Sequence, residues 1–267
     1  MKQRIITGGL GALGFLLLLS LGGWWYTALM FVLAVIAFLE FAQMREQHWK
    51  TPQMFFGLIV IALIFLSGLM ELPVLKSSSS FLKEPNPLLL GLALYSVLIV
   101  LSRNRFDLFQ MAYLLAGAIY IGYGFLYMMV AIWKPDGLAL SLLVIIVTWA
   151  NDSGAYFIGK KWGKHKLWPQ ISPNKTIQGS LGGIMFGIVT SLVIWLIHPQ
   201  LGSSLWALGM GLFITIVGQL GDLVESAWKR SAGVKDSGGI LPGHGGVLDR
   251  FDSLLFVFLI LHLIQAV

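Results

Sequence analysis

The chain has 267 residues, of which 57% are hydrophobic and 11% charged, and its formal net charge is +6. Soluble domains average about 45–50% apolar and about 25% charged residues, so this composition excludes an ordinary soluble globular protein. The chain has no cysteine, which excludes disulfides, thiolate metal sites and a cysteine nucleophile. The composition is that of a polytopic membrane protein.

Apolar runs predict about nine transmembrane helices, each needing roughly 20 mostly apolar residues. In chain order the runs cover residues 5–21, 24–39, 54–70, 88–101, 110–133, 138–158, 180–198, 205–224 and 248–267. The sixth and ninth runs reach this length only when they include polar residues, which places Asp152, Asp249 and Asp252 within helices. We read the first run as a retained helix, because no cleavage pattern of small residues follows it. The expected fold class is an all-α, polytopic integral membrane protein.

The positions of the basic residues predict the orientation. With nine crossings and the N-terminus inside, 15 of the 18 Lys and Arg residues lie on the inner side and three on the outer side. The positive-inside rule requires such a bias. We therefore expect a cytoplasmic N-terminus and an outside C-terminus. Topology explains the basic excess, so we expect the lipid bilayer and no nucleic acid as a partner.

The polar residues gather in the second half of the chain. Half of the acidic and half of the basic residues fall within 151–183 and 219–252, both on the inner side. We therefore expect two regions. Residues 1–135 would form about five N-terminal transmembrane helices. Residues 136–267 would form about four C-terminal, catalytic helices with two cytoplasmic polar loops, 151–179 and 226–250.

The second polar stretch suits a cation that holds phosphate. At 100° per residue, several of its side chains share one face of a helix leaving the membrane. Those side chains belong to Asp222, Glu225, Ser226 and Lys229. Asp249 and Asp252 lie near each other on the next helix, after a glycine-rich segment whose backbone N–H groups can turn toward anions. Facing carboxylates beside Lys and Arg are typical of a divalent cation bound to phosphate oxygens.

The first polar stretch contains a second candidate phosphate site. Residues 172–176 read Ser-Pro-Asn-Lys-Thr, and Gly179 and Ser180 follow at an expected helix start. Hydroxyls, one cation and a helix N-terminus together favour phosphate binding. The preceding basic patch fits anionic lipid and substrate equally well. It consists of Lys160, Lys161, Lys164, His165 and Lys166.

Residues 226–252 resemble a family signature position by position. The matching residues are Ser226, Lys229, Arg230, Lys235, Asp236, Pro242, His244, Gly245, Gly246, Asp249, Arg250 and Asp252. This pattern is similar to that of phosphatidate cytidylyltransferases, also called CDP-diacylglycerol synthases. The stretches 172–179 and 152–159 resemble the same family, so the resemblance covers roughly the C-terminal half. The chain has Gln178 where the family commonly has Glu, and we assign no role to it.

The resemblance implies an enzyme of phospholipid biosynthesis. It would transfer a cytidylyl group from CTP to phosphatidate, giving CDP-diacylglycerol and pyrophosphate. It also implies a divalent cation, Mg²⁺, and a homodimer. We expect the protein in the bacterial inner (plasma) membrane with the active site facing the cytoplasm, where CTP is found.

The resemblance also carries residue roles. The expected metal ligands are Asp222 and Asp249, with Glu225 and Asp252 close by. The expected catalytic residues, besides Asp222 and Asp249, are Lys229, Arg230, Lys235, Asp236, His244 and Arg250. The basic residues among them would hold phosphates, and His244 would assist the leaving pyrophosphate or simply occupy a turn. The expected substrate-binding residues are Asp152, Ser172, Asn174, Lys175, Thr176, Ser226, Gly245 and Gly246.

Two alternatives stay open at this point. A CTP-dependent transferase for another lipid, such as an isoprenoid or ether lipid, would share the headgroup chemistry. An ion-coupled transporter with Asp152 and Asp222 as carriers is disfavoured, because a transporter should show polar residues at mid-depth in several spans. Here the polar residues crowd one face.

Overall fold

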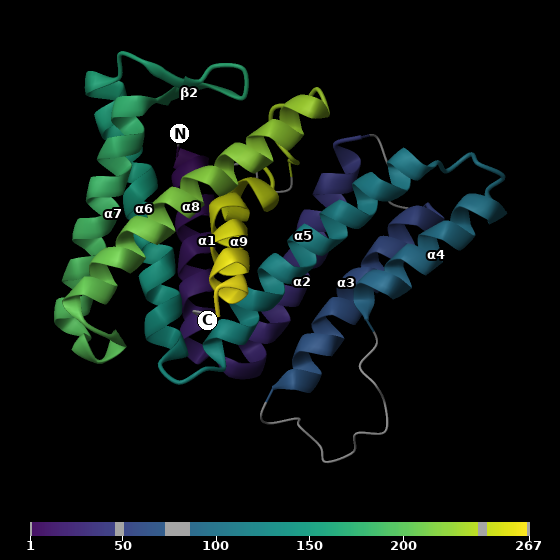
Figure 1. Cartoon of the computed structure of the whole chain (residues 1–267), viewed down its shortest axis with the longest axis horizontal. Coiled ribbons are helices and arrows are strands. Elements are labelled where there is room, and N and C mark those ends of the chain that lie inside the picture. Colours follow the sequence, from purple (N-terminus) through teal and green to yellow (C-terminus); the bar gives the residue numbers. More distant parts are fainter. Residues whose placement is uncertain (1, 46–50, 73–85, 240–244, 266–267) are drawn as a thin grey trace. The chain divides into compact units, whose positions relative to one another are not determined.

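The computed structural model describes residues 2–45, 51–72, 86–239 and 245–265 (Figure 1). In these ranges the chain forms nine α-helices, one short 3-10 helix and one antiparallel β-hairpin. The helices divide between two compact units. Unit 1 comprises Met1–Trp133 and Asp236–Asp249, and unit 2 comprises Lys134–Lys235 and Arg250–Val267.

Unit 1 is a helical bundle. Its helices are α1 (Lys2–Leu21), α2 (Gly23–Gln43), α3 (Pro52–Glu71), α4 (Pro87–Leu101) and α5 (Leu108–Ile132). Both α2 and α3 pack along α5, and α4 packs on α3. Local sequence sets the helix starts. Proline occupies the first turn of α3 and α4, and Asp107 and Gln110 form a reciprocal capping box at α5.

Unit 2 contains most of the polar residues that the sequence singles out. Its elements are α6 (Gly137–Trp162), β1 (Lys166–Trp168), β2 (Ser172–Thr176), α7 (Ile177–Ile197), η1 (Pro199–Leu201), α8 (Ser204–Ser231) and most of α9 (Leu248–Leu263). Helices α6 and α7 lie side by side, and the β1–β2 hairpin joins them at one end (Figure 1). Their backbones lie close together, since a Cβ added to Gly183 would lie 2.7 Å from the backbone carbonyl oxygen of Asn151. Small residues of this kind permit tight helix packing in membranes.

Helices α8 and α9 also pack closely. A Cβ on Gly221 would lie 2.6 Å from Cβ of Phe256 and 3.0 Å from the carbonyl oxygen of Asp252. Glycine at this position therefore lets the two helices approach within unit 2. The consequence is that Asp222, the next residue on α8, lies in the same region as Asp252.

Among the residues that the structure describes, six helices are long and apolar enough to cross a membrane, namely α2, α3, α5, α6, α7 and α8. The chain is thus an integral membrane protein with an almost wholly helical fold, and the helix positions agree with the nine apolar runs. Helices α4 and α9 have 15 and 16 residues, about 23 and 24 Å at 1.5 Å per residue. Crossing by these two and by α1 stays a prediction, as does the orientation. The hairpin was not expected.

Candidate active site

A cavity of about 480 Å³ lies in unit 2, among α6, the hairpin, the start of α7 and α8. Its volume falls within the range of about 300–1,000 Å³ that is usual for small-molecule sites. The polar side chains that line it are Asn151, Asp152, Tyr156, Lys160, Asn174, Lys175, Thr176, Ser180, Gln219 and Asp222. Residues from both polar stretches of the sequence therefore meet at one cavity.

An ion pair between Lys175 and Asp222 crosses this cavity. Lys175 comes from β2 and Asp222 from α8, and both side chains are about one-third exposed. Asp222 Oδ1 also accepts a hydrogen bond from Ser226 Oγ, at 3.3 Å, from the next turn of α8. Three expected site residues are thus in direct contact, and Lys175 neutralises a carboxylate that faces the cavity.

Further carboxylates lie close to this pair. The negative charge of Asp222 repels the carboxylates of Asp152 on α6 and of Asp252 on α9. Asp152 Oδ1 accepts from Asn151 Nδ2 at 3.1 Å, and Asp252 Oδ1 accepts from the backbone N–H of Ser253 at 2.7 Å. Three acids from three helices therefore share one region of unit 2. Their mutual repulsion favours the binding of a cation there.

A hydrogen-bond network that the sequence analysis did not identify holds one wall of the cavity. Gln219 Nε2 donates to Asn151 Oδ1 at 2.7 Å and to the carbonyl of Ser180 at 3.1 Å. Ser180 Oγ in turn donates to Gln219 Oε1. The network links α6, α7 and α8 and orients Asn151 beside Asp152. Polar side chains inside apolar spans were the signal that could have revealed it.

The expected phosphate element of residues 172–176 forms strand β2 rather than a loop. Thr176 is the N-cap of α7, where its Oγ1 accepts from the backbone N–H of Gly179 at 3.1 Å. Asn174, Lys175 and Thr176 line the cavity, whereas Ser172 does not. Gly179 is needed for space, because a Cβ there would lie 2.8 Å from the carbonyl oxygen of Ala155. The element therefore presents a cation, an amide and a hydroxyl at a helix start.

Gln178 fastens the hairpin to α7. Its Oε1 accepts from the backbone N–H groups of Lys164, at 3.1 Å, and His165, at 3.2 Å. Its Nε2 lies 3.0 Å from Nδ1 of His165. These contacts give a structural role to the position at which the chain departs from the resembled family.

We expect Gln178→Ala to loosen this end of the hairpin, because two backbone donors lose their acceptor. Hydrogen exchange at the amides of Lys164 and His165 should become about tenfold faster. Gln178→Glu should retain most of the protection, since a carboxylate accepts from both N–H groups. Equal exchange in all three proteins would contradict this role.

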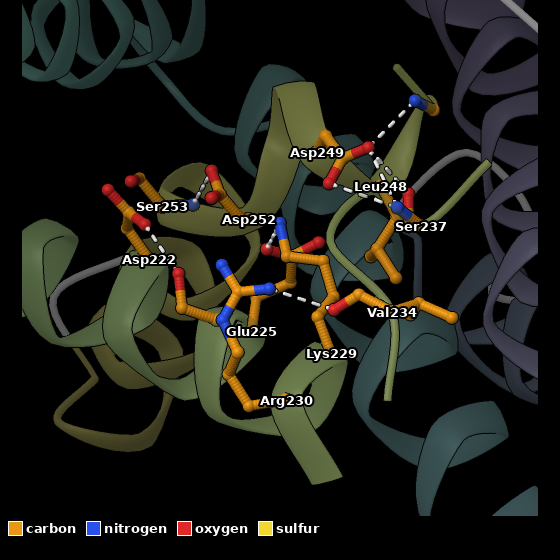
Figure 2. A network of polar contacts seen from close by, with 12 residues as sticks. Asp222, Glu225, Lys229, Arg230, Val234, Ser237, Leu248, Asp249, Asp252 and Ser253 are labelled. Atoms are coloured by element: carbon orange, nitrogen blue, oxygen red, sulfur yellow. Dashed lines mark hydrogen bonds and ion pairs between the residues drawn. The ribbon is translucent and has the colours of Figure 1, made fainter. Parts of the chain in front are cut away.

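The contacts along α8 agree with the shared helix face that the sequence predicts. Glu225 is fully buried and forms an ion pair with Lys229 at 2.5 Å, one turn later (Figure 2). Arg230 instead donates to the carbonyls of Val234, at 2.9 Å, and Ile171, at 3.3 Å. Lys229 and Arg230 thus both have protein partners, and their expected contacts with phosphates stay predictions.

In unit 1, Asp249 binds residues that precede α9. The described residues 236–239 and 245–247 are called the turn before α9 below. Its carboxylate accepts from the backbone N–H of Ser237 at 3.0 Å, from Ser237 Oγ at 3.0 Å and from the backbone N–H of Gly246 at 2.8 Å (Figure 2). Gly245 has a φ of +80°, a left-handed conformation that glycine adopts readily. Asp249 therefore supports the turn, and a cation shared between Asp222 and Asp249 stays a prediction.

The remaining expected residues divide into two groups. Lys235, Asp236 and Arg250 are exposed. His244 lies outside the described residues, so its expected role stays a prediction.

The cavity has donors that suit a hard divalent cation. Asp152 and Asp222 offer carboxylate oxygens on its wall, and Asp252 lies nearby. Oxygen donors are the ligands that Mg²⁺ takes, usually one or two carboxylates together with substrate phosphates. Within the part of the chain that the structure describes, no three acids or histidines already lie close enough to hold an ion. The donor chemistry fits Mg²⁺ bound jointly with a phosphate ligand.

Comparison with known proteins gives matches over the whole chain. A model of the cytidylyltransferase family matches residues 2–267. The phosphatidate cytidylyltransferase of Bacillus subtilis (strain 168) is 40% identical over 273 residues, covering 100% of this chain and 98% of that protein. Those of Staphylococcus haemolyticus (strain JCSC1435) and Staphylococcus aureus (strain COL) are each 39% identical, covering 99% of this chain and 98% of the relative. The similarity therefore includes the N-terminal half, where the sequence analysis found only apolar runs.

Proposed function

The chain belongs to the cytidylyltransferase family, and we propose that its reaction, the formation of CDP-diacylglycerol from CTP and phosphatidate, takes place at the cavity of unit 2. The activity follows from homology over the full length, which sets the transporter alternative aside. The single observation that carries the location is the cavity itself. It combines an anion-binding element on β2 with facing carboxylates on α6 and α8.

The reaction requires the protein to neutralise charge rather than to form a covalent bond with a substrate. An oxygen of the phosphatidate phosphate forms a bond to the α-phosphorus of CTP, and the bond from that phosphorus to the pyrophosphate oxygen breaks. The nucleophile and the leaving group both belong to the substrates. The protein must therefore align two polyanions and stabilise the charge that develops on the phosphate oxygens.

Lys175 is placed to bind the phosphates of CTP. It lies on the cavity wall between Asn174 and Thr176, at the start of α7. A nucleotide phosphate would compete with Asp222 for the Lys175 ammonium, since both are anions within its reach. Lys160, which also lines the cavity, would add a second cation. The freed Asp222 carboxylate would then be available to a metal ion.

Asp152 and Asp222 would hold the Mg²⁺, with Asp252 close by. When bound, the ion would neutralise charge on the phosphate oxygens and orient them for in-line displacement. Two carboxylates plus phosphate oxygens match the usual binding of Mg²⁺. The expected participation of Asp249 stays a prediction, and so does that of Glu225, which is buried against Lys229.

Helix lengths support a site at the rim of the bilayer. Counting at 1.5 Å per residue, Asp152 lies about 22 Å along α6 and Asp222 about 27 Å along α8. The hydrocarbon core is about 30 Å thick, so if each helix enters the core at its first residue, both carboxylates would lie toward its far edge. There they can meet a lipid headgroup without drawing its acyl chains into water. The basic residues of the hairpin support a cytoplasmic orientation, and the homodimer implied by the resemblance stays a prediction.

The test is an assay of the purified full-length protein with labelled CTP and phosphatidate. We expect CDP-diacylglycerol and pyrophosphate in equal amounts, and no product after the divalent cation is removed with a chelator. Readdition of Mg²⁺ should restore turnover. Isoprenoid phosphates and ether lipids serve as competing acceptors. Preferred use of one of these over phosphatidate would contradict the proposed acceptor.

A further inference from the structure

A buried glutamate of unit 1 has no role in the chemistry described above. Glu40 lies near the end of α2, a candidate membrane span, and is the only acidic or basic residue in that helix. Its side chain is 1% exposed. A carboxylate buried to this extent in an apolar helix is costly unless other groups compensate for it. Its partners should therefore indicate its role.

The partners of Glu40 belong to the turn that leads into α9. Glu40 Oε2 accepts a hydrogen bond from the backbone N–H of Leu248 at 3.0 Å. Leu248 is the first residue of α9, where an N–H group has no partner within the helix. The backbone of Val247 and the side chain of Ser237 are the next hydrogen-bonding neighbours of the carboxylate. Glu40 thus supplies, from 208 residues away in the chain, the acceptor that a local capping residue would normally supply.

Two glycines of the same turn fit around this carboxylate. A Cβ added to Gly238 would lie 2.8 Å from Glu40 Oε1, and one added to Gly246 would lie 2.5 Å from Glu40 Oε2. Any larger residue at either position would collide with the carboxylate. The backbone of the turn therefore follows the shape of the Glu40 side chain closely.

Ser237 and Gly246 lie between Glu40 and Asp249. Both donate hydrogen bonds to the Asp249 carboxylate, and both also neighbour Glu40: a Cβ on Gly246 would lie 2.5 Å from Glu40 Oε2, and the Ser237 side chain is a hydrogen-bonding neighbour of the Glu40 carboxylate. We propose that Glu40 is a positioning residue that holds the turn and, through it, the Asp249 carboxylate and the Gly245–Gly246 backbone in their working geometry. This inference rests on the proposed function for its catalytic consequence, but the contacts themselves do not depend on it.

The experiment compares Glu40→Ala, Glu40→Gln and wild type as purified full-length proteins. Glutamine retains one oxygen that can accept from Leu248, whereas alanine retains none. We expect Glu40→Ala to lower kcat by about 100-fold, because a displacement of about 1 Å in a catalytic group has an effect of this size. KM for CTP should stay within about twofold, and Glu40→Gln should restore most of kcat. Glu71→Gln, at an exposed position in the same unit, is the matched control and should match wild type.

Hydrogen exchange provides the readout that is independent of catalysis. In Glu40→Ala the amides of Ser237, Gly246 and Leu248 should exchange faster, while the amides of α3 and α5 keep their protection. Unchanged exchange at the turn together with unchanged kcat would overturn the proposal. So would a uniform loss of protection across unit 1, which would make Glu40 a general packing residue. If the wild type itself fails to use CTP and phosphatidate, the proposed function fails, and the exchange pattern alone decides the role of Glu40.

Discussion

Asp222→Asn should slow CDP-diacylglycerol formation strongly, lowering kcat by on the order of 10²–10³-fold. The substitution keeps the shape of the side chain but removes the charge that pairs with Lys175 and would hold Mg²⁺. The Mg²⁺ concentration needed for half-maximal rate should rise at the same time, because one ligand is weakened. Initial rates with labelled CTP over a range of Mg²⁺ concentrations measure both effects.

Asp136→Asn is the matched control for this variant. Asp136 is exposed at the opposite end of α6 from the cavity, and its side chain makes no capping hydrogen bond. Its φ of 56° is one that asparagine tolerates well. The control should turn over at the wild-type rate. Turnover of Asp222→Asn within about threefold of wild type would remove Asp222 from the site.

Asp249→Asn should lower kcat by about 100-fold, for a different physical reason. The Asp249 carboxylate accepts from Ser237 twice and from Gly246 once. These three bonds all end on Oδ2, and the backbone N–H of Ser237 also donates to Oδ1 at 3.2 Å. An amide that keeps its oxygen at the Oδ2 position would therefore turn its NH₂ group toward the Ser237 N–H, and the turn before α9 would shift. Labelled-CTP assays give kcat, and hydrogen exchange at Ser237 and Gly246 reports the shift.

The dependence on Mg²⁺ separates two roles of Asp249. A ligand shared with Asp222 should show the same rise in Mg²⁺ requirement as Asp222→Asn, whereas a purely supporting residue should lower kcat at an unchanged requirement. Asp107→Asn is the control within unit 1. Asparagine can keep the Oδ1 acceptor with which Asp107 caps α5, so this variant should behave as wild type. A normal kcat for Asp249→Asn would contradict both roles.

The helices were predictable because their signal is physical and local. A span needs a continuous apolar run, and the runs of this chain begin and end close to the helices found. The length that a span requires also predicted that the sixth helix includes polar residues, and α6 does continue through Asp152 to Trp162. The shared face of α8 followed from 100° per residue. It is confirmed by the Ser226–Asp222 and Lys229–Glu225 contacts.

The parts that could not be predicted depend on tertiary contacts. Strands β1 and β2 are three and five residues long and contain Lys and Pro, so no alternation of apolar residues indicates them. They are held partly by Gln178, from outside the hairpin. The partners of Gln219 lie 39 and 68 residues away in the chain. Glu40 did carry a signal, a lone acid in an apolar span, but only the structure shows which segment it supports.

The distance along the chain between Glu40 and Leu248 has a consequence for biosynthesis. At about 5–20 residues per second, a ribosome needs roughly 10–40 s to make the intervening segment. During that time α2 must be accommodated by the insertion machinery with its glutamate still lacking the backbone donor that it will finally bind. The contact between Glu40 and Leu248 can therefore form only when almost the whole polypeptide has been made, and a chain that ends before Leu248 would leave the Glu40 carboxylate without this donor.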